Sequence, residues 1–346
     1  MAKRGLLTRP RTITGKKTTP KGLKPQQARQ LIRRFHVLQK NKTRIISKIN
    51  QQWPHKSTPE GPEGPMNLDE SNYKSVILEK FSGIYPHKDF RLDDQKKNLE
   101  TILKLDQKIS LQDLVKELAK IDAEIEYRGG LKAYQSASTQ GQNNNRGGDS
   151  SKKLIEWITA HAPYEKFLKN NKSEPLNALE IGCLDPNNVI STCGIFQSVA
   201  KIDLNSQSPH ILEQDFMKRP LPENNQQRFN LISCSLVLNF VPTPKERGEM
   251  LLRITQFLKP PTKKKPSMSS FFFVLPLPCL QNSRYMDSDR FESMMSDLGF
   301  SKVFRHESSK IVYYLFDWSG KVKQVKYPKK ELHSGGSRNN FCIVIE

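Results

Sequence analysis

The sequence has few cysteines, and none is placed to hold a metal ion. Five cysteines occur in 346 residues, without a Cys-x-x-Cys pair or another metal-ligand spacing. We therefore expect reduced cysteines in an intracellular protein and no metal site. The longest apolar run, residues 271–280, contains two prolines and is too short to span a bilayer. The basic N-terminus lacks the apolar stretch of a secretory signal, so we expect no membrane partner.

Negative charge is missing from the first part of the chain. No aspartate or glutamate precedes Glu60, whereas lysines and arginines recur throughout that segment, and the formal net charge is +21. Like charges at this density repel one another unless a polyanion neutralises them, and contacts to phosphates release counterions. The composition indicates contact with RNA, and the same lysines can act as a nuclear import signal; a solvated tail is the alternative. An enzyme for a small neutral metabolite has little use for such a segment.

The chain is expected to contain four regions. They are a disordered basic tail (1–23), a basic helix with a Pro/Gly-rich linker (24–66), a helical extension with a Gly/Gln-rich loop (67–150) and an α/β core (151–346). Apolar residues recur at helical spacing from Leu31 to Ile49, which predicts an amphipathic helix over 25–51 suited to lying on RNA or on a partner. Residues 129–142 offer glycines, amides, hydroxyls and Tyr134, which suits a lid over a polar ligand; a polar surface loop is the alternative.

From residue 176 onward, strand and helix patterns alternate, which favours a parallel sheet with helices on both faces. Strands are expected at residues 178–181, 199–204, 210–213, 229–234, 271–275, 303–306, 311–316 and 341–345. Helices are expected at residues 245–258, after a Thr-Pro start, and 289–298, before a glycine. A doubly wound sheet that ends in antiparallel strands is the layout of the class I (Rossmann-like) seven-strand methyltransferase core, here with a helical, basic N-terminal extension.

The first strand of this core ends in a pattern that is typical of a nucleoside site. Glu180 lies in the strand, Gly182 follows it, and Asp203 closes the next strand. Glycine lets the backbone approach a ligand, and an acid about 20 residues on accepts hydrogen bonds from ribose hydroxyls. An ordinary turn or cap role for Asp203 is the alternative. The turn lacks the G-x-G-x-x-G pattern and contains Asp185 and Pro186, so it disfavours a pyrophosphate and fits the cationic cofactor S-adenosyl-L-methionine.

Further candidate residues follow the third and fourth strands. Asp215 can accept a hydrogen bond from the adenine amino group of the cofactor, and Phe216 can pack beside that ring. The acceptor is expected after the fourth strand, where Ser235 and Asn239 are the candidate catalytic residues. Asn239 can bind a base edge and Phe240 can stack on it, as with a flipped base. The alternative is that this segment belongs to the core and Asn239 caps a turn.

Three motifs together resemble one narrow family. They are Gly-Gly-Leu followed by Tyr-Gln and Ala-Ser within residues 129–138, Leu-Glu-Ile-Gly-Cys-Leu at 179–184, and Ser-Leu-Val-Leu-Asn-Phe-Val-Pro at 235–242. The sequence is similar to the fungal 25S ribosomal RNA adenine-N(1) methyltransferases, whose animal relatives are S-adenosylmethionine sensors, and the similarity extends to residues 338–341. The resemblance implies a nucleolar enzyme with Gly182 and Asp203 at the cofactor.

The sequence departs from the amino-directed adenine methyltransferases in one respect. No Asp/Asn-Pro-Pro-Tyr motif follows the fourth strand, which disfavours transfer to the exocyclic amine. Adenine N1 has an in-plane lone pair, so alignment in a dry pocket is enough for transfer without a protein nucleophile or a metal. The leading hypothesis is therefore methylation of N1 of an adenine in large-subunit ribosomal RNA or a pre-ribosomal particle, in the nucleus and nucleolus. The alternatives are a cofactor-sensing protein without transferase activity and a protein methyltransferase.

Overall fold

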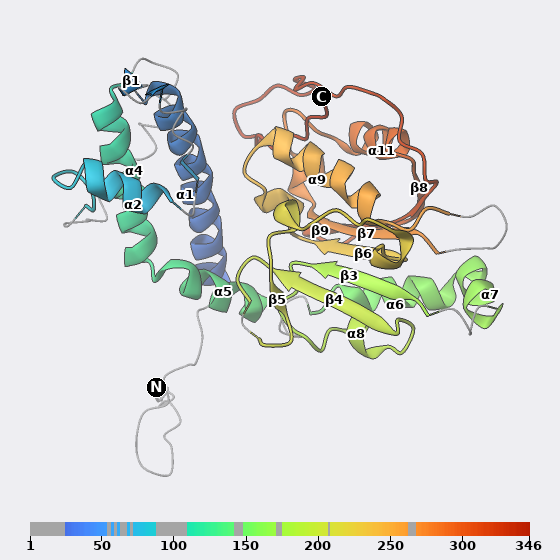
Figure 1. The fold of residues 1–346 in the computed structure, drawn as a ribbon. Coiled ribbons are helices and arrows are strands. Elements are labelled where there is room, and N and C mark those ends of the chain that lie inside the picture. The colour runs from blue at the N-terminus through green and yellow to red at the C-terminus, as the bar shows by residue number, and fades with distance from the viewer. Residues whose placement is uncertain are drawn as a thin grey trace, which may run out of the picture. The chain divides into compact units, whose positions relative to one another are not determined.

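The computed structural model separates into two compact units, Met1–Arg146 and Gly147–Glu346 (Figure 1). It describes residues 25–53, 57–58, 61–62, 68–69, 72–87, 109–141, 148–170, 175–206, 208–261 and 268–346. The predicted tail and most of the predicted linker lie outside these residues. The second unit begins four residues before the predicted core, at 147 instead of 151.

The first unit is built from helices. Its elements are α1 (Pro25–Gln52), the strand pair β1 (Ser57–Thr58) and β2 (Gly61–Pro62), α2 (Tyr73–Lys80), α4 (Leu111–Tyr127) and α5 (Gly130–Gly141). The predicted helix over 25–51 is therefore confirmed. No helix of the described residues is long and apolar enough to cross a membrane.

The apolar face of α1 is covered by the unit's own helices. Leu38, Ile45 and Ile49 are buried, and they form one cluster with Leu114 and Leu118 of α4. Residues at this spacing lie on one face of a helix, which here packs against α4. That face is therefore used for intramolecular packing. A contact of α1 with RNA or with another protein stays a prediction.

Buried charges on α4 are paired with α1. Arg34 donates two hydrogen bonds to the fully buried Glu124 carboxylate, at 2.6 and 2.5 Å, and Arg128 donates a third at 2.8 Å. Burial raises the pKa of Glu124, but the hydrogen bonds from the two arginines outweigh it and leave the pKa below the ordinary value. The ion pairs therefore fix the register of α1 on α4.

Most of the polar stretch predicted as a loop is the helix α5 (Gly130–Gly141), so the loop prediction was wrong. Helix α5 begins after Gly129, whose φ is +85°, and the Tyr134 ring stacks on Phe35 of α1 with centroids 4.5 Å apart. This packing overrides the weak helix propensity of the glycines and hydroxyl residues. The side chains of Gln135, Ser138 and Gln140 lie outside the described part of the chain.

The second unit is a seven-stranded sheet in the order β5-β4-β3-β6-β7-β9-β8. The strands are β3 (Asn177–Ile181), β4 (Ser198–Asp203), β5 (Leu212–Glu213), β6 (Leu231–Ser235), β7 (Ser270–Pro276), β8 (Phe300–Glu307) and β9 (Ile311–Trp318). The pairs from β5 to β7 are parallel, and β9 is antiparallel to both of its neighbours. This order with one reversed strand confirms the predicted class I methyltransferase layout.

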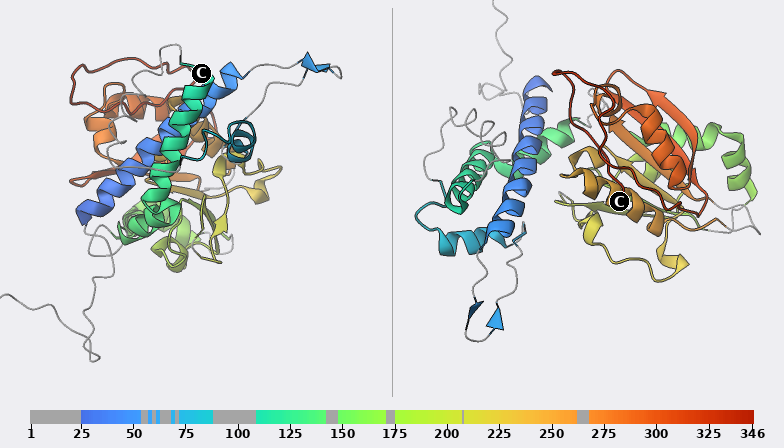
Figure 2. Two further views of the ribbon diagram at one scale, coloured as in Figure 1. Left: turned by 90° about the vertical axis from the view of Figure 1, so that its left-hand side faces the viewer. Right: turned by 90° about the horizontal axis from the view of Figure 1, so that it is seen from above.

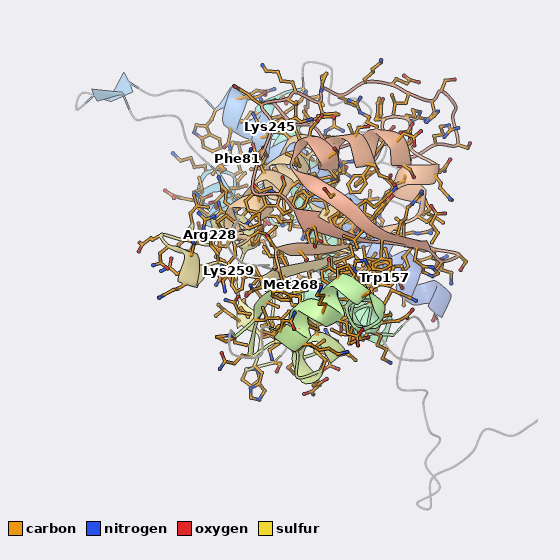
Figure 3. The ribbon with its side chains drawn as sticks, turned by 90° about the vertical axis from the view of Figure 1, so that its right-hand side faces the viewer. Phe81, Trp157, Arg228, Lys245, Lys259 and Met268 are labelled. Atoms are coloured by element: carbon orange, nitrogen blue, oxygen red, sulfur yellow. The ribbon has the colours of Figure 1, made fainter. Side chains whose placement is uncertain are left out.

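Helices cover both faces of this sheet (Figures 1 and 2). The helical elements are α6 (Ser151–Ala160), α7 (Ala162–Asn170), α8 (Val189–Thr192), η1 (Phe216–Lys218), η2 (Asn225–Gln227), η3 (Leu238–Phe240), α9 (Pro244–Phe257), α10 (Pro278–Gln281) and α11 (Ser288–Asp297). Because side chains of a strand alternate between faces, Phe271 and Phe273 of β7 join the core under α9 and α11, whereas Phe272 joins the core under α6 to α8. On that side Trp157 of α6 stacks on Phe304 of β8 at 5.2 Å (Figure 3).

Helix α9 starts as the sequence predicts, whereas the predicted C-terminal strand is not part of the sheet. Helix α9 begins with a capping box in which Thr243 and Glu246 bond each other's backbone amides, as the Thr-Pro pattern indicates. The predicted strand at 341–345 was wrong, because these residues pack along α9 instead of extending the sheet. Val344 donates a backbone hydrogen bond to Pro244 O, and Ile345 forms an isolated bridge with Tyr327 outside the seven-stranded sheet. A short run of apolar, mostly buried residues resembles a core strand there.

Candidate active site

The candidate site lies at the carboxyl ends of β3, β4 and β6. The chain runs from β3 to β4 and β5 on one side and then returns to β6 on the other side of β3. In open α/β sheets this reversal of strand order leaves a crevice at which ligands bind. The sheet thereby brings Gly182, Asp203, Ser235 and Asn239 to the same edge.

Gly182 allows the turns after β3 and β6 to come close together. Its φ is +77°, and a Cβ placed there would lie 2.3 Å from Cγ2 of Val237. Its amide donates to Ile202 O of β4 at 2.9 Å, which holds the turn against the neighbouring strand. Any side chain larger than hydrogen would be strained and would collide with Val237. The position therefore presents bare backbone at the edge.

The turn after β6 is strained as well. Leu236 has a φ of +58°, which is the only positive φ at a described residue other than glycine, and its amide donates to Val274 O at 2.9 Å. Left-handed backbone at a leucine costs roughly 1–2 kcal/mol, and such strain is found mostly at functional sites. The turn aims η3, with Asn239, away from the strand direction.

Glu180 is a buried carboxylate with an unsatisfied oxygen. Its side chain is on β3, Oε1 accepts a hydrogen bond from Asn188 Nδ2 at 2.6 Å, and Oε2 has no partner among the described residues. Burial raises the pKa of Glu180 to about 7, and the nearby Cys183 thiol and the hydrogen bond from Asn188 oppose this shift only in part. A buried acceptor without a donor is costly, so this oxygen is suited to a ligand that carries hydrogen-bond donors or positive charge.

Asp149 and Ser150 complete this corner of the site, and sequence reasoning missed both. Asp149 accepts hydrogen bonds from the amides of Ser151 at 2.8 Å and Val189 at 2.6 Å, so it joins the start of α6 to the loop after β3. Ser150 Oγ lies 2.8 Å from Ser235 Oγ at the end of β6. The available signal was the Asp-Ser-Ser sequence directly before a helix, which is typical of an N-terminal cap.

Asp203 lies at the end of β4, one strand away from Gly182. Its Oδ1 accepts a hydrogen bond from the Asn205 amide at 2.9 Å, and its other carboxylate oxygen has no hydrogen bond within the described residues. Burial raises its pKa, and the neighbouring Glu213 carboxylate adds to the shift. An acceptor in this position can bind a pair of ribose hydroxyls, as its spacing from Gly182 predicts.

Asp215 and Phe216 have structural contacts of their own. Asp215 Oδ1 caps the 3-10 turn η1 by accepting from the Met217 amide at 2.8 Å. Phe216 is buried in the core, where its ring lies 5.2 Å from that of Phe257 and the Arg253 guanidinium lies 5.8 Å from it. A contact of Asp215 with the cofactor stays a prediction, and the core packing of Phe216 accounts for that residue without a ligand.

Asn239 and Phe240 lie in η3, directly after the strained turn. Asn239 Oδ1 is buried and has no partner in the described chain, whereas Phe240 is 37% exposed. A buried amide oxygen in need of a donor and a partly exposed ring fit a purine with an exocyclic amino group. Their roles as base contacts, and that of Ser235, stay predictions.

Arg247 holds the segment after η3 in place. Its buried guanidinium donates to Val241 O at 3.0 Å, Pro242 O at 3.3 Å and Cys342 O at 2.8 Å. These bonds tie the loop that carries Asn239 to the C-terminal segment. Nothing in the sequence distinguishes Arg247 from the other arginines, so this role could not be predicted.

Comparison with known proteins identifies the family of the chain. The family described as 25S rRNA (adenine(2142)-N(1))-methyltransferase, Bmt2, matches residues 119–343. The chain belongs to this family. The match includes β3, β4, β6 and the C-terminal segment, and therefore every candidate residue above.

Two relatives are similar over long stretches. The chain is 33% identical over 360 residues to the 25S rRNA (adenine(2142)-N(1))-methyltransferase of Saccharomyces cerevisiae, which covers 97% of this chain and 98% of the relative. It is 44% identical over 230 residues to a 25S rRNA adenine-N(1) methyltransferase of Schizosaccharomyces pombe, covering 66% and 82%. Among solved structures, the 16S rRNA methylase RmtB is 14% identical, with a TM-score of 0.36 over 73% of this chain and 100% of that chain.

Proposed function

We infer that this Bmt2-family protein transfers a methyl group from S-adenosyl-L-methionine to N1 of an adenine in 25S ribosomal RNA. Two observations together support the inference. The chain belongs to a family that is described by this reaction, and the edge of its sheet carries two buried oxygens, on Glu180 and Asn239, that have no hydrogen-bond donor among the described residues. Glu180 lies on β3 and Asn239 follows β6, the neighbouring strand. The turns after these two strands come close together at Gly182 and Val237. One oxygen is suited to the cofactor and the other to the base.

The β3–β4 half of the edge fits the cofactor. The Glu180 carboxylate can pair with the ammonium group of its methionine part, Gly182 leaves room for it, and Asp203 can accept from the ribose hydroxyls. Asp185, which is exposed, and Asp203 also disfavour phosphate in this half. Bound there, the cofactor supplies an electrophilic methyl group.

The β6 half fits the acceptor base. The Asn239 amide oxygen can accept a hydrogen bond from the adenine N6 amino group, which would leave N1 free of protein contacts. Arg247 and the turn at Leu236 fix the loop from two sides, so the amide is positioned before the base enters. Because N1 has its own lone pair, the protein contributes orientation and exclusion of water instead of a nucleophile.

The test is nucleoside mass spectrometry of large-subunit ribosomal RNA from cells that lack the protein. We expect one N1-methyladenosine to disappear and to return with the wild-type chain but not with Asp203→Ala. Cofactor affinity of purified Asp203→Ala should fall together with turnover. Unchanged methylation in the deletion strain would reject the proposed function in favour of a cofactor-sensing role.

We further propose that the protein works in the nucleolus, where large-subunit RNA is made. The support is the nature of the substrate and the acid-free N-terminal segment. Deletion of residues 1–23 should shift a fluorescently tagged chain toward the cytoplasm. It should leave cofactor affinity of the purified protein unchanged, and an unaltered nucleolar signal would contradict the proposal.

A further inference from the structure

The C-terminal segment 321–338, which we name the basic strap, is strongly charged. It contains six lysines and arginines and one acidic residue. All five of its lysines are exposed: Lys321, Lys323, Lys326, Lys329 and Lys330. A run of this density on a folded surface needs a polyanion or solvent to balance it.

The strap is held along α11 at both ends (Figure 1). Near its start, Lys323 pairs with Asp297 at the end of α11, with Nζ 2.9 Å from Oδ1. Farther on, His333 Nε2 lies 3.0 Å from Asp287 Oδ2 at the start of the same helix. Between them, Arg290 of α11 donates to Pro328 O at 2.6 Å. The strap is thus an ordered track with a defined direction.

That direction leads to the candidate active site. Helix α11 follows β7 and precedes the parallel β8, so it begins at the carboxyl edge of the sheet and ends at the opposite edge. The strap runs the other way, toward the carboxyl edge. Just beyond it, Asn339 donates to Asn282 O at 2.8 Å and to Pro278 O at 2.6 Å, beside the end of β7. The later part of the strap, with Lys329 and Lys330, therefore lies toward the edge that carries Asn239.

The two halves of this edge differ in charge. On the strap side, Asp287 and Asp289 lie at the start of α11, and Asp287 is paired with His333 of the strap. The cofactor half carries Asp185, Asp203 and Glu213, which repel phosphates. On the opposite half, the strap is joined by Arg284, which donates to Gly335 O at 3.1 Å. An RNA chain that places a base at Asn239 meets repulsion on one side and attraction on the other.

We propose that the basic strap binds the phosphate backbone of the RNA next to the methylated adenine. The proposal rests on the proposed function, since it specifies how that substrate approaches the site. Lys326 and Lys330 are the phosphate contacts: both are exposed, and neither forms an ion pair with a described residue. Such contacts position the RNA without reading its sequence.

The test measures binding of the full-length chain to a 25S rRNA transcript that spans the region of adenine 2142. The variant is Lys326→Gln with Lys330→Gln, and the matched control is Lys166→Gln with Lys169→Gln, which removes two exposed lysines from α7. Loss of two phosphate contacts should make the slope of log affinity against log salt shallower by about 1.4–1.8. This corresponds to roughly 15- to 30-fold weaker binding near 0.15 M salt. S-adenosylmethionine affinity should not change.

Two results would overturn the proposal. One is a strap variant that binds the transcript with the wild-type or control affinity and salt slope. The other is normal transcript binding with loss of methylation only on pre-ribosomal particles, which would assign the strap to a protein of the particle. Wild-type protein that binds the transcript in a strap-dependent way but methylates no adenine would instead reject the proposed function, and the strap contact would stand.

Discussion

The two units bury carboxylates in opposite ways. In the helical unit, Glu124 receives hydrogen bonds from two arginines, and Asp122 receives them from the hydroxyls of Tyr73 and Tyr85 at 2.9 and 2.8 Å. In the sheet unit, Glu180 receives one hydrogen bond from an amide, and its second oxygen has no partner in the described chain. The first kind of carboxylate is satisfied within the fold, whereas the second keeps an oxygen without a partner among the described residues, and the proposed cofactor contact rests on this oxygen.

The pKa values follow the same division. Burial raises the pKa of both Glu124 and Glu180, but only Glu124 has cations that reverse the effect. Glu180, whose pKa burial raises to about 7, is the carboxylate that is stabilised most when a cationic group binds next to it. This difference distinguishes Glu124, which is satisfied within the helical unit, from Glu180, for which we propose a contact with the cofactor.

The largest effect is expected from Glu180→Gln on cofactor binding. The change keeps the shape and removes the charge, so a buried charge-assisted hydrogen bond of roughly 2–3 kcal/mol is lost. The dissociation constant for S-adenosylmethionine should rise about 30- to 150-fold in calorimetric titrations, while the melting temperature of the free protein does not fall. An equal loss of fold stability would mean that Glu180 is structural like Glu124.

Glu124→Gln tests the other side of the comparison. Removing the charge leaves Arg34 and Arg128 without their carboxylate; since both arginines are partly exposed, we expect a loss of about 2 kcal/mol, below the range for fully buried pairs. Denaturant unfolding monitored on the helical unit measures it. Cofactor affinity should stay at the wild-type level, and a large drop in that affinity would break the division between the units.

Asn239→Ala is expected to act on the RNA step alone. One acceptor for the adenine amino group is lost, which corresponds to about tenfold in kcat/KM for the RNA substrate. Affinity for S-adenosylmethionine should be unchanged, because Asn239 follows β6 and not β3 or β4. A parallel fall in both would place Asn239 at the cofactor.

Much of the sheet unit was predictable because its signals are local. Gly182 and Asp203 each close a strand, so the parallel order of β3 and β4 alone brings them to one edge. The contacts of Asp149 and Arg247 were not predictable, since they join segments 40 and 95 residues apart in the chain. No periodicity records which distant carbonyl a side chain will meet.

The two wrong element assignments have the same origin. Glycine and polar residues at 129–142 favour a loop, but Tyr134 stacks on Phe35 of α1. The continuous apolar run at 341–345 favours a strand, but it packs along α9 instead. In both cases tertiary packing overrides local preference, which is weak for short segments. The basic character of the strap, in contrast, can be seen in the sequence. Its position along α11 cannot, because it depends on contacts between segments that are far apart in the chain.

The smallest expected effect is a pH dependence of cofactor binding that comes from Glu180. Its pKa in the free protein is raised from 4.5 to about 7, so the protonated form is favoured by the ligand-free fold. The stability that this form contributes is complete below about pH 4.5 and is lost as the pH rises through about 7. The cationic cofactor prefers the ionised form, and the ionised fraction rises about tenfold between pH 6 and pH 8.

Affinity for the cofactor should therefore increase by up to about tenfold over that range in the wild-type chain and stay flat in Glu180→Gln. The same increase in both proteins would show that another group titrates, and a flat wild-type profile would show that Glu180 is already ionised and paired before the cofactor binds.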